Sequence, residues 1–403
     1  MSPSHIDSLP HAFDVSVDLA LPVTIQQDLR LLFTRDVFAP DNALLTSVLT
    51  PRDEGVTPRV LVFWDDGLAH AWPDMHARIT AWFAAWADRV RLVGEPVPVP
   101  GGEQVKNDRT QLERVWAAID AVHLCRHSYV LVVGGGAVLD MVGFGAATAH
   151  RGIPLVRLPT TSLSQADGGI GVKNGVNYFG KKNWLGSFAV PHAVVNDAAF
   201  LHTLPMRERR AGLVEAVKVS LIRDAAFFDY IEAHTQALAA CEPHVFEAVV
   251  RTSARHHLEH IATAGDPFEK GSARPLDFGH WAAHKLEQIT RFTLGHGEAV
   301  AIGLALDILY AERIGLLPFV TAERILAVLS GIGFALYDPA LAIRRGDGRR
   351  VVLEGLEEFR EHLGGRLTIP MVRAPGEKVD VHTMDADHVD AAIDALAARY
   401  GHG

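Results

Sequence analysis

The chain has 403 residues, more than one ordinary domain needs, so we expect two domains. Hydrophobic residues make up 48% and charged residues 21%, as in soluble globular proteins, which excludes global disorder. The formal net charge of -10 offers no electrostatic footprint for a phosphate backbone, so nucleic acid is not an expected partner.

The first half of the chain alternates runs of β-branched residues with helical segments, the pattern of a parallel sheet covered by helices. The expected strands cover residues 59–64, 90–93, 129–133 and 154–158, and the expected helices cover residues 76–88 and 108–123, with a loop at 98–107. Near the start, residues 14–18 alternate like a strand and would add an edge to the sheet.

From about Thr203 the pattern changes to long helical segments with few strand signals. The expected helices cover residues 207–223, 227–238, 245–264 and 298–314. We place the boundary between Val190 and Leu204, which gives an α/β domain over residues 1–195 and a mainly α-helical domain over residues 196–403.

The apolar strand at 129–133 runs directly into Gly134-Gly135-Gly136, and a helix of small residues follows. Such a turn can present backbone N–H groups and a helix N-terminus to a pyrophosphate. The spacing is not the GxGxxG fingerprint, however, and a glycine turn after a buried strand often serves only tight packing. The motif alone leaves nucleotide binding and tight packing as equal alternatives.

A Gly-rich loop over residues 166–177, followed by Lys181-Lys182-Asn183, places amides and cations close together in the sequence. Backbone N–H groups can wrap an oxyanion there, and lysines can neutralise it. The alternative is a flexible, solvated loop. A carboxylate among the lysines, Asp167, favours an organised site.

Glu215, His280 and His296 stand out as candidate metal ligands. Two imidazoles and one carboxylate suit a catalytic divalent cation such as zinc, with a position left open for substrate. Spacing alone does not prove that they converge, because most of the 21 histidines are expected to be ordinary surface or core residues. His280 and His284 share a helix face, whereas we interpret the cluster of His256, His257 and His260 as a solvated face.

The two cysteines, Cys125 and Cys241, are too few for a disulfide framework and fit a reducing compartment. Residues 1–18 lack a cationic start followed by an apolar run, and the most apolar helical stretch, residues 299–317, is interrupted by charges. We therefore expect a cytoplasmic protein without a membrane span.

Seven short motifs follow one another between about Arg59 and Leu306. They are Gly134-Gly-Gly-Ala-Val-Leu-Asp140, Arg151-Gly, Pro159-Thr-Thr161, the loop from Asp167 to Asn183, Glu215-x-x-Lys218, Phe278-Gly-His280-x-x-x-His284 and His296-Gly-Glu-Ala-Val300. As a set, and in this order, they resemble the dehydroquinate synthase superfamily, the sugar phosphate cyclases. The last hundred residues match that pattern weakly.

The resemblance implies an N-terminal Rossmann-like NAD-binding domain, a C-terminal mainly α-helical metal-binding domain, a cleft between them and a homodimer. The residues that it implies for NAD are Asp65, Glu103, Lys106, Gly135, Gly136, Asp140, Thr160 and Thr161. The implied metal ligands, for zinc or cobalt, are Glu215, His280 and His296. The implied substrate residues are Asp167, Lys173, Lys182, Asn183, Lys218 and His284, and Arg151 would reach the phosphate of the substrate bound to the partner subunit.

The resemblance also implies the chemistry. NAD would oxidise a ring alcohol with help from the metal, phosphate would be eliminated, and the hydride would be returned before an intramolecular aldol addition closes a carbocycle. The net reaction would be elimination and cyclisation, because NAD is regenerated.

The sequence departs from the family pattern at the substrate's carboxylate. An ungapped count puts Glu259 and Ala273 where the pattern has a lysine and an arginine, Arg274 lies one residue out of step, and Asp277 replaces an asparagine. The family's late Asp-Lys-Lys motif appears as residues 359–362, without the lysine pair. Replacing a cation with an anion beside a desolvated carboxylate costs on the order of several kcal/mol. The departures therefore favour a substrate with an uncharged terminus, sedoheptulose 7-phosphate, and a valiolone-type cyclitol product.

Three alternatives remain. The first is 3-dehydroquinate synthase itself, acting on the heptulosonate 7-phosphate of the shikimate pathway, which Arg274 and His284 keep open. The second is a metal-dependent polyol dehydrogenase of the glycerol phosphate type. The third is a nucleotide-binding structural or sensor protein that has lost catalysis, against which the complete Glu/His/His trio argues.

Overall fold

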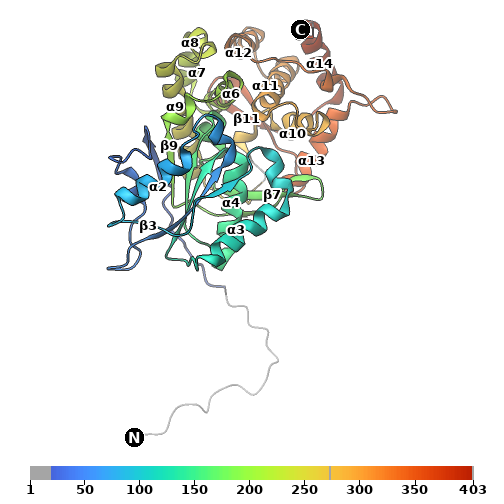
Figure 1. Ribbon diagram of the computed structural model, residues 1–403. Helices are drawn as coiled ribbons and strands as arrows, with labels where there is room; N and C mark the ends of the chain where they lie inside the picture. The colour runs from blue at the N-terminus through green and yellow to red at the C-terminus, as the bar shows by residue number, and fades with distance from the viewer. Residues whose placement is uncertain (1–19, 272–273, 402–403) are drawn as a thin grey trace, which may run out of the picture.

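The computed structural model describes residues 20–271 and 274–401, and it divides into a sheet-bearing half and a helical half. In Figure 1 the first half, coloured blue to green, lies below the second half, coloured yellow to red. The predicted fold class, α/β with a mainly helical second half, is confirmed. The division at residue 195 stays a prediction, and the last strand of the sheet runs across that position. The strand-like pattern at residues 14–18 lies outside the described residues.

Among the described residues, seven parallel strands form one sheet in the order β1-β9-β6-β5-β2-β3, with β4 also paired to β2. Their bounds are β1 Leu31–Thr34, β2 Arg59–Asp65, β3 Arg91–Leu92, β4 Val97–Val99, β5 Tyr129–Gly134, β6 Leu155–Pro159 and β9 Ala193–Asp197. Every residue of β5 is buried. Its continuous apolar run follows from that position, because a central parallel strand is covered on both faces.

Helices cover both faces of the sheet. One face packs against α1 (Leu44–Val48) and α2 (Met75–Ala85), and the other against α3 (Arg109–Ala121) and α4 (Gly136–Thr148). Successive side chains of β5 point to opposite faces of the sheet. Leu131 packs in the cluster that contains Trp82 of α2, and Val132 packs in the cluster that contains Leu139 of α4.

Two segments predicted as loops contain regular structure. Residues 98–107 include part of β4 and a 3-10 turn, Glu103–Asn107. The Gly-rich segment forms part of an antiparallel hairpin of β7 (Lys173–Tyr178) and β8 (Lys181–Phe188). Glycine and lysine are uncommon in strands, so the pattern did not reveal the pairing. The prediction of a loop was wrong here.

The helical half contains α5 Ala198–Leu201, α6 Met206–Arg223, α7 Ala225–Ala233, α8 Thr235–Ala239, α9 Pro243–Thr263, α10 His280–Ile289, α11 His296–Arg313, α12 Phe319–Ile332, α13 Glu354–His362 and α14 Ala386–Tyr400. It also contains an unpredicted hairpin of β10 (Ile369–Ala374) and β11 (Glu377–Val381). Helix α11 is buried along most of its length, which explains its apolar sequence. No helix within the described parts of the chain combines the length and apolar character needed to cross a membrane.

Candidate metal and substrate site

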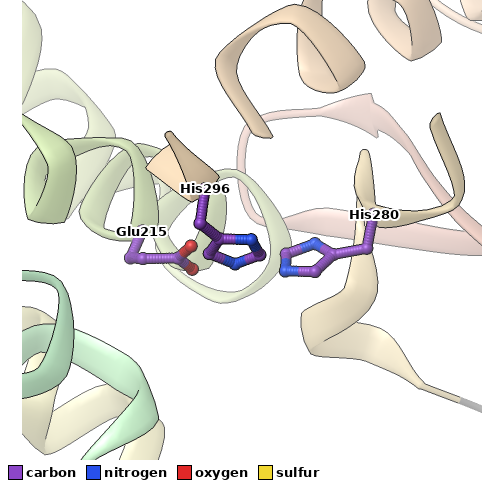
Figure 2. A group of neighbouring side chains, drawn as sticks. All are labelled: Glu215, His280 and His296. Atoms are coloured by element: carbon purple, nitrogen blue, oxygen red, sulfur yellow. The ribbon is translucent and has the colours of Figure 1, made fainter. Parts of the chain in front are cut away.

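Three helices bring Glu215, His280 and His296 together. Glu215 lies in the buried middle of α6, while His280 and His296 are the first residues of α10 and α11. Their ligand atoms all lie within 4.8 Å of one another. Figure 2 shows Glu215 and His280 pointing toward His296 from opposite sides. The three predicted ligands therefore meet, although some 80 residues separate the first from the last in the sequence.

Close packing between α10 and α11 places His280. Gly279 has φ +78°, in the left-handed region that favours glycine, and a Cβ there would lie 2.7 Å from the backbone nitrogen of Leu304. The buried carboxylate of Asp307 accepts hydrogen bonds from Gly279 N at 3.0 Å and from Trp281 Nε1 at 2.8 Å. Asp307 thereby holds both neighbours of His280, and burial raises its own pKa to about 7.

The hydrogen bonds of both histidines fix which ring nitrogen carries the proton. His280 Nδ1 lies 3.1 Å from Phe278 O, and His296 Nδ1 lies 3.1 Å from Glu287 Oε2. Because these oxygens only accept, each Nδ1 carries a hydrogen and each Nε2 keeps its lone pair for a cation. Burial lowers the pKa of His280 well below the usual range and that of His284 to about 3. Neutral imidazole is the form that binds metals.

One lysine lies between two carboxylates, of which Glu215 is buried and Asp167 is partly buried. Lys218 Nζ donates to Asp167 Oδ2 at 2.8 Å and forms an ion pair with Glu215. Burial raises the pKa of Glu215 well above its usual range, and its Oε2 contacts Lys218. A divalent cation would favour the ionised carboxylate. The donor set, its burial and its neutral imidazoles therefore fit zinc or cobalt.

Helix α9 contributes a residue that sequence reasoning misplaced. His256 and His257 are buried, so their interpretation as a solvated face was wrong. Helix α9 packs against α6 and the turn Ser164–Gly168, which brings His257 Nδ1 to 3.4 Å from Asp167 Oδ1. Burial would raise the pKa of Asp167, but the charges of His257 and Lys218 outweigh it and hold that pKa well below its usual range.

Glu259 does not face the site. Its side chain is 48% exposed and pairs with Arg255 at 3.6 Å along the surface of α9. The ungapped count that gives Glu259 the place of the family's lysine stays a prediction, and because a helix turns about 100° per residue, a small register error would change the face.

The cations predicted for the substrate are already paired. Lys182 of β8 donates to Glu287 Oε1 at 2.9 Å, and Lys173 of β7 pairs with Glu269 at 2.6 Å. Burial would lower the pKa of each lysine, but the neighbouring carboxylates outweigh it and raise both. Both side chains are therefore ammonium groups.

The residues predicted for NAD gather at the carboxyl ends of β2, β5 and β6. Asp65 ends β2, Gly135 and Gly136 follow β5, and Thr160 and Thr161 follow β6. Crevices at the carboxyl ends of parallel strands are where α/β sheets bind ligands. Gly135 precedes α4, whose first turn receives no side-chain cap from the described residues, so its N–H groups are available to an anion.

Two predicted groups overlap beside this edge. Lys106 donates to Asp140 Oδ2 at 2.8 Å, lies 3.8 Å from Glu103 and contacts Asn183 Oδ1. Asn183 was predicted for the substrate, but the structure places it against the lysine predicted for NAD. The residues predicted for NAD and those predicted for the substrate are therefore in contact with each other.

Arg151 lies in an exposed 3-10 turn, Ala149–Arg151, after α4. His150 and Arg151 have φ of 50° and 63°, two consecutive non-glycine residues in the left-handed region. Strained conformations of this kind are enriched at functional sites, and Arg291 and Phe292 form a second such pair.

Sequence reasoning missed Glu287, Asp307 and His257. For Glu287 a signal existed, because it lies three residues after His284 and seven after His280, on the same face of α10. Asp307 and His257 gave no local signal, since their roles depend on contacts between helices.

Known proteins match this chain over much of its length. The models for the N-terminal and C-terminal parts of 3-dehydroquinate synthase match residues 96–211 and 212–343. A 3-dehydroquinate synthase from Halorhodospira halophila is 38% identical over 298 residues, which cover 73% of this chain and 82% of that protein. A 2-epi-valiolone synthase from Actinosynnema mirum is 34% identical over 375 residues, 92% of each chain.

A solved structure agrees with these relatives. ValA, the 2-epi-5-epi-valiolone synthase from Streptomyces hygroscopicus with NAD+ and Zn2+ bound, has a TM-score of 0.83 and 28% identity to this chain, and the match covers 94% of this chain and 100% of that chain. The resemblance seen in the motifs is therefore confirmed, and the chain belongs to the 3-dehydroquinate synthase family, the sugar phosphate cyclases.

Proposed function

We propose that this chain is an NAD- and metal-dependent cyclase that converts sedoheptulose 7-phosphate to a valiolone-type cyclitol. The proposal has two parts: the chemistry of the family and the choice of a substrate with an uncharged terminus. The first part is supported by the metal trio and by the relatives described above. The second depends on the cations around the substrate.

Glu215, His280 and His296 would hold the metal, and the strand ends with Gly135 and Gly136 would hold the dinucleotide. When bound, NAD+ supplies a reversible hydride acceptor and the metal supplies Lewis acidity for the alcohol that is oxidised.

The side chains of the chain itself would bind and stabilise the phosphate. Lys173 and Lys182 are ammonium groups and can balance the charge of the leaving phosphate. His284, with a pKa of about 3, is neutral and can donate an N–H to an oxygen without adding charge. Burial would lower the pKa of Lys218, but Asp167 and Glu215 outweigh burial and raise it, so Lys218 stays protonated beside the metal trio.

The observation that carries the substrate choice is the environment of Arg274. This arginine lies one residue from the position where the family pattern has its carboxylate-binding arginine. Its guanidinium is buried, pairs with Glu269 at 2.9 Å and donates to Gly271 O at 2.5 Å and Glu269 O at 2.6 Å. Because these contacts with nearby residues engage the guanidinium, it is not available to a substrate carboxylate.

Asp277, which follows Arg274 by three residues, adds a negative charge. Burial would raise its pKa, but the charge of Lys173 outweighs burial and lowers it, so the group is ionised. An anionic substrate terminus would be repelled there, whereas a hydroxymethyl group could donate a hydrogen bond to the carboxylate.

Steady-state phosphate release from the two sugars tests the proposal. We expect kcat/KM for sedoheptulose 7-phosphate to exceed that for the heptulosonate 7-phosphate by at least about tenfold, with no net NADH formed. The opposite preference would make the protein a 3-dehydroquinate synthase, the alternative that the relative from Halorhodospira halophila supports. Stoichiometric NADH without phosphate release would instead indicate a polyol dehydrogenase.

We further propose a cytoplasmic homodimer in which Arg151 reaches the partner's substrate. The strained turn that presents Arg151 supports this role. Mixing Arg151→Ala and Lys218→Met chains tests it, because one site of each mixed dimer would then carry neither change. Recovery of about a quarter of the wild-type activity would support sharing, and no recovery by mixed dimers would contradict it.

A further inference from the structure

Glu287 of α10 is a buried carboxylate, 4% exposed, for which the proposed chemistry has no role. Its two oxygens have different partners. Oε1 accepts a hydrogen bond from Lys182 Nζ at 2.9 Å, and Oε2 lies 3.1 Å from His296 Nδ1. The side chain therefore joins the β7–β8 hairpin, which extends from the sheet half, to a candidate metal ligand of the helical half.

The contact with His296 has a defined chemical effect. A carboxylate at Nδ1 keeps the proton on that nitrogen, orients the ring and increases the basicity of Nε2 toward a metal. His280 receives the same support from a backbone oxygen, Phe278 O, which no side-chain substitution removes. Glu287 is thus the side chain through which the orientation of His296 can be changed.

The other contact of Glu287 restrains the side chain of Lys182. A lysine loses side-chain entropy when it is fixed, and its contact with a buried carboxylate meets part of that cost before the substrate arrives. Because both contacts come from one rigid helical residue, the position of the lysine and the orientation of the imidazole are set together.

We propose that Glu287 is a positioning residue that orients His296 for the metal and Lys182 for the substrate phosphate at the same time. The second role rests on the proposed function, whereas the first does not. A different arrangement competes with it, since ligand atoms of His284, Glu287 and His296 also lie within 4.8 Å of one another. We favour the positioning role because both oxygens of Glu287 are engaged, and Oε2 contacts His296 Nδ1, so the histidine offers its other ring nitrogen to a metal.

Zinc titration of the metal-free full chain against a competing chelator tests the first role without any turnover. We expect Glu287→Ala to weaken zinc binding by about 10- to 100-fold and Glu287→Gln by less, because an amide oxygen can still accept from Nδ1. Glu215→Ala, which removes a ligand, should weaken it further. Unchanged zinc affinity in Glu287→Ala overturns the proposal. So does a loss in Glu287→Ala that exceeds the loss in Glu215→Ala, because it would make Glu287 a ligand.

A double-mutant cycle with Lys182→Met at saturating zinc tests the second role. We expect each single change to raise KM for the sugar phosphate, and the double change to raise it by clearly less than the product of the two effects. Fully multiplicative effects would remove Lys182 from the proposal. If the wild-type protein releases no phosphate from any sugar phosphate, the proposed function fails, and the zinc titration still decides the role at His296.

Glu354→Gln is the matched control. Glu354 also pairs with a lysine of α10, Lys285, at 2.9 Å, but its carboxylate contacts no histidine in the described structure. We expect its zinc affinity and KM to stay within about twofold of wild type. Thermal unfolding of each variant shows whether the chain still folds.

Discussion

The two halves of the candidate site are built by different means. In the sheet half, the turn after β5 offers main-chain N–H groups and the space left by glycine, at a place where parallel strands end. In the helical half, ionisable side chains from α6, α10 and α11 lie against one another, mostly buried. The main-chain site should be sensitive to added side-chain atoms, whereas the buried site should be sensitive to the loss of any one charge.

Removing the shared lysine is the strongest way to test this contrast. Lys218→Met leaves the buried Glu215 and the partly buried Asp167 without their common cation. We expect the free energy of unfolding to fall by about 3–5 kcal/mol and phosphate release to fall by more than about 100-fold. Urea unfolding and a phosphate assay measure the two effects. Lys270→Met, at an exposed lysine, is the control, and a loss of less than about 1 kcal/mol in Lys218→Met would contradict the argument.

Asp307 tests the helical half through pH. Its folded pKa of about 7 lies above the ordinary 3.8, so the folded chain holds this proton more tightly than the unfolded chain. The stability that this provides is complete below about pH 4 and is lost as the pH rises through about 7, an effect of up to about 4 kcal/mol.

The variant Asp307→Asn cannot ionise. We therefore expect wild type to lose stability relative to this variant between pH 4 and 7, and the difference to become constant above about pH 8. Urea unfolding at pH 5, 6, 7 and 8 measures it, with Asp88→Asn at an exposed aspartate as control. A difference that does not change with pH would show that Asp307 is not protonated in the folded chain.

Two glycines of α4 test the sheet half. A Cβ at Gly136 would meet no described atom within 4 Å, whereas a Cβ at Gly145 would lie 2.6 Å from Val115 Cγ1. Because a helical Cβ tilts toward the helix N-terminus, Gly136→Ala should weaken NAD binding by about tenfold without loss of stability. Gly145→Ala should lower the melting temperature and spare NAD affinity. Calorimetric NAD titration and thermal unfolding distinguish them, and the reverse pattern would exclude the turn from the cofactor site.

The smallest expected effect concerns the residue that the ungapped count gives the place of the family's lysine. Glu259→Lys introduces the charge that a substrate carboxylate would need, but on the exposed surface of α9. We expect the ratio of kcat/KM values for the two sugars to change by less than about twofold. A tenfold gain for the carboxylated sugar would show that this position does face the site.

Sequence reasoning was accurate where a pattern is local. The apolar strand before Gly134 and the long helices α6 and α11 each carry their own signal in composition and periodicity. It failed at the β7–β8 hairpin, where low strand propensity concealed the pairing, and at His257, where the packing of α9 determines which face is buried. Motif order identified the candidate ligands, but not their supporting contacts.

The sequence by itself determined the α/β class, the family and the identity of the three candidate ligands, because each depends on residue types and their order along the chain. Only the tertiary structure decided that these ligands meet, that Arg274 is held within its own loop, and that Glu287 links His296 to Lys182. Such contacts join residues that are distant in the sequence, and the burial that determines their charge and orientation exists only in the folded chain.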